Sequence, residues 1–204
     1  MSLSMLAAFW AVSALFVITP GADWAYAISA GIRGNRVLPA VAGMLSGHLI
    51  ATLIVSAGVG SVIASIPGAL SALTIVGAAY LLWLGIGMLR QPLEPLTGKE
   101  EDIGSPLKWA LKGFCISGLN PKVFLLFLAL LPQFTDIHAG WPLPLQMTAL
   151  GLVHVLSCGV VYLLVGYGSG IVLQTRPRAA KNIGQISGGL MIIVAILLLA
   201  EQFF

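Results

Sequence analysis

Six long apolar stretches, separated by short polar segments, constrain the fold of this chain more than any other feature of its sequence. They run over residues 3–31, 37–66, 70–89, 109–131, 143–173 and 183–204. Each stretch meets or exceeds the roughly 20 residues that an α-helix needs to cross the hydrocarbon core of a bilayer. The stretches are far longer than barrel strands and do not alternate in polarity, so helices are the only plausible spans. We therefore predict an all-α, polytopic membrane protein with six transmembrane helices.

Composition agrees with membrane embedding and excludes several other classes of protein. Only 8% of the residues are charged and 58% are hydrophobic, whereas a soluble domain carries about 25% charged residues. The ten Lys and Arg are too few and too scattered for a phosphate-binding face, so no nucleic-acid partner is predicted. Cys115 and Cys158 lie singly in apolar stretches without CxxC spacing, which indicates neither a metal site nor a disulfide. The N-terminus lacks the basic region of a cleaved signal peptide, so we expect the first stretch to remain as a span.

Nine of the ten cationic residues fall on one side of the predicted spans. They are Arg33, Arg36, Arg90, Lys99, Lys108, Lys112, Arg176, Arg178 and Lys181. The opposite loops, residues 65–69 and 132–142, contain no Lys or Arg. By the positive-inside rule, the basic loops are predicted to be cytoplasmic and both termini to face outward.

The chain also divides into two halves of three predicted helices each. Residues 91–108 are rich in charge and proline and are interpreted as a cytoplasmic linker between a first repeat, 1–90, and a second repeat, 109–204. Because three is odd, the halves enter the membrane in opposite senses, as in transporters built from inverted repeats. Similar features recur in both halves, which favours such a repeat. These are the breakers Pro20-Gly21 and Asn120-Pro121, and the pairs His48 with Gly60 and His154 with Gly166.

The tenth cation, Lys122, lies inside an apolar stretch directly after a helix breaker. A lysine at bilayer depth costs about 2.5 to 3.5 kcal/mol, so it is expected to have a partner or a task. Asp23 is its counterpart in the first stretch, where it follows Pro20 and Gly21. Proline removes a helical hydrogen bond, and the break leaves free amide groups at the start of the next half-helix. Two broken helices, at Pro20-Gly21 and at Pro121, are therefore predicted, each with one charge after its break.

A free amino acid carries an ammonium and a carboxylate, so this pair of charges matches it chemically. We predict a substrate site near the membrane midplane that includes Asp23, Lys122 and Asn120. In the alternative interpretation, Asp23 and Lys122 pair with each other and hold the two halves together, and the two roles coexist if substrate displaces a resting ion pair. A further hypothesis is that Asp23 carries the proton that couples transport to the proton gradient.

Two other residues, His48 and Tyr80, are weaker candidates for the same site. His48 and His154 can be hydrogen-bonded packing residues or proton relays, and the sequence leaves both open. Tyr80 can reach the cavity with its hydroxyl or make an ordinary helix contact. The spacing of small residues, as in Gly43 and Gly47, allows helices to approach closely and permits a homodimer without demanding one.

Motifs of common membrane and soluble enzymes are absent from the sequence. Gly98-Lys99 lacks the preceding glycine and the following Ser or Thr of a P-loop, and neither HExxH nor GxSxG occurs. We therefore predict neither an enzyme nor a cofactor.

At several of these positions the chain resembles the LysE/RhtB family of bacterial amino-acid exporters. The resemblance covers essentially the whole chain and depends on Thr19-Pro-Gly-Ala-Asp23, on Gly77-Ala-Ala-Tyr-Leu-Leu-Trp-Leu-Gly85, and on Asn120-Pro-Lys122 leading to Leu131-Pro-Gln-Phe134. It implies a multi-pass exporter in the cytoplasmic (inner) membrane, driven by the proton motive force, for amino acids such as lysine, homoserine, threonine or leucine. Ala22 stands where the family often has a second proline, and Asp23 stands where asparagine is also common.

The sequence thus predicts a secondary active exporter of amino acids or related small metabolites, surrounded by lipid and working by alternating access. A channel-like facilitator and a non-transporting membrane scaffold or sensor remain as alternatives. An exporter moves solute uphill and shows counterflow, a channel allows only downhill flux, and a scaffold shows neither. The motifs do not select one amino acid, because relatives that share them differ in what they export.

Overall fold

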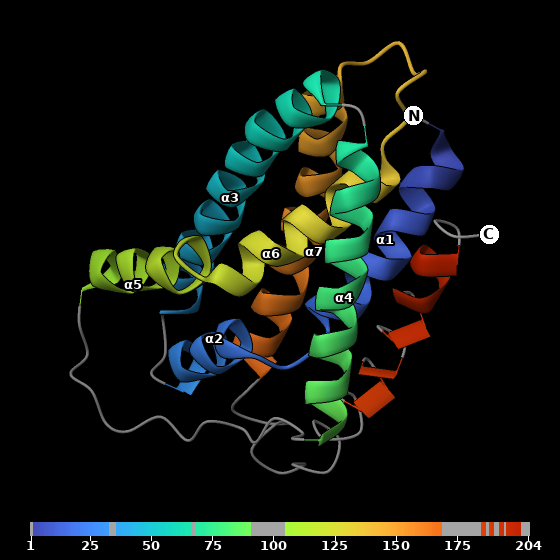
Figure 1. Ribbon diagram of the computed structural model, residues 1–204. Coiled ribbons are helices and arrows are strands. Elements are labelled where there is room, and N and C mark those ends of the chain that lie inside the picture. The colour runs from blue at the N-terminus through green and yellow to red at the C-terminus, as the bar shows by residue number, and fades with distance from the viewer. Residues whose placement is uncertain are drawn as a thin grey trace.

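The structure, a computed structural model, describes residues 2–32, 36–66, 68–90, 105–168 and, except for 187, 190, 191 and 194, residues 185–200. These residues form α-helices and one short 3₁₀ helix, without a strand among them (Figure 1). The elements are α1 (Leu3–Val17), α2 (Ala22–Ile32), α3 (Val37–Ser65), α4 (Ala69–Arg90), α5 (Pro106–Gly118), α6 (Pro121–Leu130), η1 (Leu131–Phe134) and α7 (Leu143–Gly168). The prediction of an all-α protein is therefore confirmed.

Length and composition identify the helices of the described part that can cross a membrane. Val37–Val59 of α3 and Leu143–Gly168 of α7 are each long and apolar enough on their own. The pairs α1 with α2 and α5 with α6 qualify only if each bent pair counts as one span, which gives up to four. In α4 the apolar run Thr74–Gly87 is shorter. The predictions of six spans and of an inverted repeat stay predictions, as does the division of the chain into two repeats and a linker.

The predicted linker, residues 91–108, lies mostly outside the described residues. Its last three residues belong to α5, which begins at Pro106. This start has a clear local cause, since the side chain of Ser105 accepts a hydrogen bond from the backbone N–H of Lys108 and proline suits the first helical turn.

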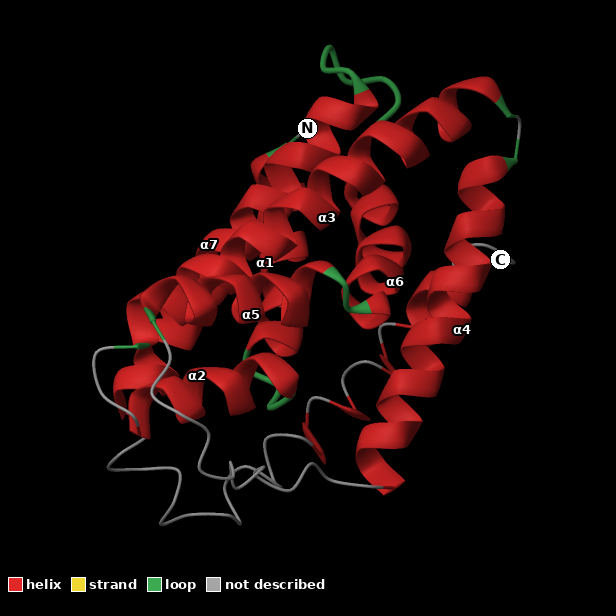
Figure 2. Ribbon diagram, turned by 90° about the vertical axis from the view of Figure 1, so that its left-hand side faces the viewer, coloured by secondary structure: helices red, strands yellow, loops and turns green. Residues whose placement is uncertain are grey.

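The three long helices do not all run in the same direction. In Figure 1, α3 rises from the lower to the upper end of the molecule, α4 returns to the lower end, and α7 also runs from top to bottom. The lower ends of α3 and α4 are marked by Arg36 and Arg90, whereas the segment between η1 and α7 lies at the upper end. Figure 2 shows α4 at one side of the molecule, with α6 between it and the other helices. Two of the described basic residues thus lie at the lower end.

Helices α3 and α5 cross at very short range through two glycines of α3. A Cβ atom added to Gly47 would lie 2.5 Å from the backbone N of Gly118 and 2.8 Å from the backbone O of Phe114. Gly43 similarly faces the backbone of Ala110. Side chains at these positions would hold the two helices apart, so the small residues bring α5 against the middle of α3.

Two apolar clusters surround the broken helices. One joins α2, α3, α5 and α7 around residues such as Tyr26, Met44 and Trp109, and the other joins α1, α3, α6 and α7 around Phe9, Phe127 and others. Between them lie buried polar side chains, among them His48 and His154. Because an unpaired polar group in such surroundings is costly, these side chains are expected to have specific partners.

Candidate functional site

The first break separates α1 from α2 and turns the chain by 64°. Helix α1 ends at Val17, and α2 begins again at Ala22, so Pro20 and Gly21 lie in the connection. The indole N–H of Trp24 donates to the carbonyl of Val17 at 2.9 Å and satisfies one of the carbonyls that the break leaves without a helical partner. Asp23 stands in the first turn of α2, at the positive end of the helix dipole, where a carboxylate is stabilised.

The second break separates α5 from α6 and turns the chain by 51°. Asn120 caps α6, because its side-chain oxygen accepts a hydrogen bond from the backbone N–H of Lys122 at 3.0 Å. Pro121 occupies the first turn, a position where its missing N–H costs nothing. Lys122 follows in the same turn, and a cation there is repelled by the helix dipole. The geometry favours an anion beside Lys122.

Both breaks open onto one cavity of about 70 Å³. Its wall contains the starts of α2 and α6, so the free amides of both half-helices are close to the same space. Of the residues predicted for the site, the structure brings together Gly21, Asp23, His48, Asn120 and Lys122. The rest of the wall is Phe16, Val17, Thr19, Ala22, Trp24, Val123, Leu126, His154 and Tyr162. The wall of this site therefore carries one carboxylate, one ammonium and two imidazoles among mostly apolar side chains.

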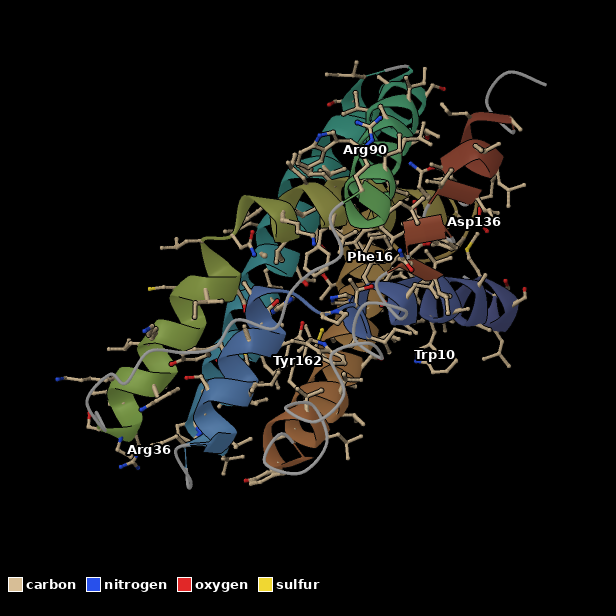
Figure 3. The ribbon with its side chains drawn as sticks, turned by 90° about the horizontal axis from the view of Figure 1, so that it is seen from below. Trp10, Phe16, Arg36, Arg90, Asp136 and Tyr162 are labelled. Atoms are coloured by element: carbon tan, nitrogen blue, oxygen red, sulfur yellow. The ribbon has the colours of Figure 1, made fainter. Side chains whose placement is uncertain are left out.

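Asp23 is held by side chains from three other helices. The hydroxyl of Ser117 in α5 donates to Oδ1 at 2.6 Å, and the hydroxyl of Tyr162 in α7 donates to Oδ2 at 3.3 Å. His48 of α3 places its Nε2 atom 4.0 Å from Oδ2. The ammonium of Lys122 is within range of electrostatic interaction with the carboxylate. Figure 3 shows Tyr162 among the ribbons near the centre of the molecule, whereas Arg36 lies at the margin.

The two buried histidines are neighbours. Their ring centroids are 5.7 Å apart, and Phe127 packs edge-on against His154. Nδ1 of His48 is 3.0 Å from the carbonyl oxygen of Met44, and Nδ1 of His154 is 2.7 Å from the hydroxyl of Ser13. Each ring is therefore held by a partner at Nδ1.

His48, His154 and Cys158 place one donor atom each within 4.8 Å of one another, which makes them the group in the described residues with a composition suited to a metal ion. Both Nδ1 atoms have protein partners, so the two Nε2 atoms and the Cys158 thiol are the atoms left to bind an ion. We assign no metal to this group.

The remaining predicted residues lie elsewhere or cannot be placed. Pro20 is half-buried at the first break and does not line the cavity. Tyr80 belongs to α4, but its side chain is outside the part that the structure describes.

Sequence reasoning missed Ser117 and Tyr162, and it did not place His154 in the site. A signal was present for two of them. His154, Cys158 and Tyr162 are four residues apart in an otherwise apolar helix, so they share one face of α7. Polar groups repeated at this spacing within a span point to a polar interior surface. Ser117, next to Gly118, carries no comparable signal.

Comparison with known proteins identifies the family to which the chain belongs. The family model described as LysE type translocator matches residues 14–202. The leucine efflux protein of Klebsiella pneumoniae is 30% identical over 177 residues, which cover 83% of each chain. An uncharacterized membrane protein of Vibrio cholerae is 31% identical over 172 residues, covering 82% of this chain and 80% of the relative. The leucine efflux protein of an Enterobacter species is 26% identical over 193 residues, covering 90% and 89%.

No solved structure matches the chain at a comparable level of significance. The match to the family model spans nearly all of the chain, and it confirms the resemblance that the motifs at both breaks indicated. Together with the apolar helices it makes this a bacterial membrane protein. The chain belongs to the family of LysE type translocators.

Proposed function

We propose that the protein exports an amino acid through the cavity between its two broken helices. The observation that carries the proposal is the placement of Asp23 and Lys122 on one cavity wall, each in the first turn of a half-helix. Lys122 and the free amides of α6 bind the substrate carboxylate, and Asp23 binds its ammonium. The names of the relatives from Klebsiella pneumoniae and Enterobacter support export of an amino acid.

The apolar part of the cavity suits an aliphatic side chain. Phe16, Val17, Val123 and Leu126 line it, and Asp23 is the only acid among the lining residues. A second cationic group on the substrate would therefore lack a partner in this wall, and its desolvation would weaken binding. Leucine, which two relatives carry in their names, is the first substrate to test.

We further propose that export is driven by the proton motive force and proceeds by alternating access in the inner membrane. The two bent helix pairs support this mechanism, because broken helices at a midplane site let two parts of a transporter rock around a bound solute. The nine cations on one side of the predicted spans support cytoplasmic basic loops and outward termini.

Counterflow of radiolabelled leucine in proteoliposomes tests the proposal. The wild-type protein is expected to accumulate label transiently when the vesicles are preloaded with unlabelled leucine. Lys122→Ala is expected to weaken substrate binding by about 10 to 100-fold, because a hydrogen bond to a charged group contributes about 1.5 to 3 kcal/mol.

Lys112→Ala is the matched control, since Lys112 is an exposed lysine of α5 that does not line the cavity. It should behave as wild type. Normal counterflow by Lys122→Ala would refute the site, and flux that is only downhill in the wild type would indicate a channel instead of an exporter.

A further inference from the structure

The hydrogen bonds around His48 define which of its ring nitrogens carries a proton. Nδ1 lies 3.0 Å from the carbonyl oxygen of Met44, one helical turn earlier in α3. A carbonyl oxygen can only accept, so Nδ1 is the donor and bears hydrogen. In the neutral imidazole, Nε2 then carries no hydrogen and presents a lone pair.

This lone pair faces a second acceptor. Nε2 is 4.0 Å from Oδ2 of Asp23, and the two side chains are only 3% and 16% exposed. The carboxylate itself is arranged to accept, because the hydroxyls of Ser117 and Tyr162 both donate to it. Two acceptors that face each other in a nearly dry site repel, whereas one proton on Nε2 turns the contact into an ion pair.

We propose that His48 is the proton-binding residue of the transport cycle and that Asp23 is its counter-ion. This inference rests on the proposed function and moves the coupling proton from Asp23 to Nε2 of His48. The distance of 4.0 Å is longer than a hydrogen bond, and protonation is expected to close it by about 1 Å.

Competition for Asp23 then explains coupling. The carboxylate can neutralise one cation, either the imidazolium of His48 or the ammonium of the substrate. Lys122 already places a positive charge on the same cavity wall, so holding both additional cations at once is costly in a low dielectric. Substrate binding therefore releases the proton from His48, and proton binding releases substrate, which is one-for-one antiport.

Other titratable groups near His48 are arranged differently. His154 of α7 is next to it, but its Nδ1 contacts Ser13. Tyr162 of α7 donates to Asp23, and Cys158 lies one turn earlier on the same face of that helix. Lys122 of α6 lines the same cavity and carries the charge opposite to that of Asp23. Among these groups, His48 is the one whose unprotonated Nε2 atom faces the carboxylate of Asp23.

Proteoliposomes with a pH gradient and a membrane potential clamped to zero test the inference. A gradient of one pH unit can sustain about a tenfold leucine gradient if one proton is exchanged for each substrate. The wild type should approach this ratio, and His48→Gln should sustain none, while whatever exchange it retains becomes independent of pH. His138→Gln is the matched control, because His138 lies exposed in the segment between η1 and α7 and should keep the gradient.

The outcomes separate the two proposals. If the wild type shows no counterflow of any amino acid, the proposed function fails, and this inference fails with it. If the wild type couples and His48→Gln still sustains the gradient, only the role of His48 is refuted. Loss of coupling in the wild type on adding EDTA would also refute the role of His48, because the histidines would then bind a metal ion.

Nuclear magnetic resonance keeps the inference testable if His48→Gln does not fold. The chain has three histidines, so protein labelled with ¹³C-histidine gives three ring signals, which His138→Gln and His154→Gln assign by elimination. At a pH where His48 is protonated, leucine should move its signal to that of the neutral ring and leave His138 unchanged. A His48 signal that responds neither to pH nor to leucine would overturn the proposal.

Discussion

At the scale of single residues, Asp23 connects its own helix with three others. It belongs to α2, and its contacts come from His48 in α3, Ser117 in α5 and Tyr162 in α7. The first two helices precede the predicted linker and the last two follow it. A movement of one half against the other must therefore change the surroundings of this carboxylate, which makes it a suitable place to couple substrate to a global transition.

Removing the charge of Asp23 tests this role. Asp23→Asn presents an amide whose N–H groups repel an ammonium, so we expect leucine binding to weaken by about 10 to 100-fold and proton-driven accumulation to disappear. The concentration dependence of counterflow measures the first effect, and the pH-gradient assay measures the second.

Asp136→Asn is the control for that substitution. Asp136 lies between η1 and α7, away from the cavity, where its side chain accepts a hydrogen bond from the backbone N–H of His138. Its variant should transport as wild type. Unchanged affinity and full coupling in Asp23→Asn would contradict the proposed site.

At the scale of helices, the crossing of α3 and α5 positions the site. The close contact at Gly47 places α5, which carries Ser117, against the helix that carries His48. A larger separation would move the Ser117 hydroxyl away from Asp23, so a packing feature distant from any charge controls the geometry of the carboxylate.

Adding one methyl group at this crossing should destabilise the protein. In Gly47→Ala the new Cβ meets backbone atoms of Phe114 and Gly118, which cannot rotate away. Overpacking of this kind costs about 1 to 3 kcal/mol, so we expect the Tm in detergent to fall by about 3 to 10 °C. Circular dichroism recorded as a function of temperature measures this change in Tm.

Gly58→Ala is a matched control in the same helix. A Cβ at Gly58 has nothing within 4 Å, and alanine favours a helix by about 1 kcal/mol relative to glycine. This variant should be as stable as wild type or slightly more stable. An equal loss of stability in both variants would show that close approach at Gly47 is not the cause.

At the scale of the whole molecule, the distribution of charge and the direction of the helices together define two ends. Arg36 and Arg90 stand at the lower ends of α3 and α4 in Figure 1, and the segment between η1 and α7 occupies the other end. This upper segment is ordered by Gln146, a fully buried side chain that hydrogen-bonds with backbone groups of Asp136 and Trp141. We expect the two ends to face opposite sides of the membrane.

Cysteine labelling measures this orientation. In a Cys115→Ser background, which leaves the buried Cys158, His138→Cys should react with an impermeant maleimide added to intact spheroplasts. Lys108→Cys, at the start of α5, should react only after the membrane is opened. The reverse pattern would invert the proposed topology, and reaction of both from outside would refute two opposite ends.

Local properties of the sequence determined the helical class and the family. Apolar stretches of sufficient length predict helices, because a backbone away from water must satisfy its own hydrogen bonds. The pairs Pro20-Gly21 and Asn120-Pro121 mark where helices end and begin again, since proline breaks the hydrogen bonding of the helical turn that contains it. For the same reason Asp23 and Lys122 could be singled out from the chain alone, as charges that follow a break.

Only the tertiary structure decided which side chains meet at Asp23. Ser117 is 94 positions away in the chain and Tyr162 is 139. Their contacts depend on the angle and distance at which helices cross. The spacing of Gly43 and Gly47 allows a close approach, but it does not identify the helix that packs there. The role proposed for His48 likewise depends on three-dimensional geometry, because a hydrogen bond to Met44 within its own helix directs Nε2 toward a carboxylate on another helix.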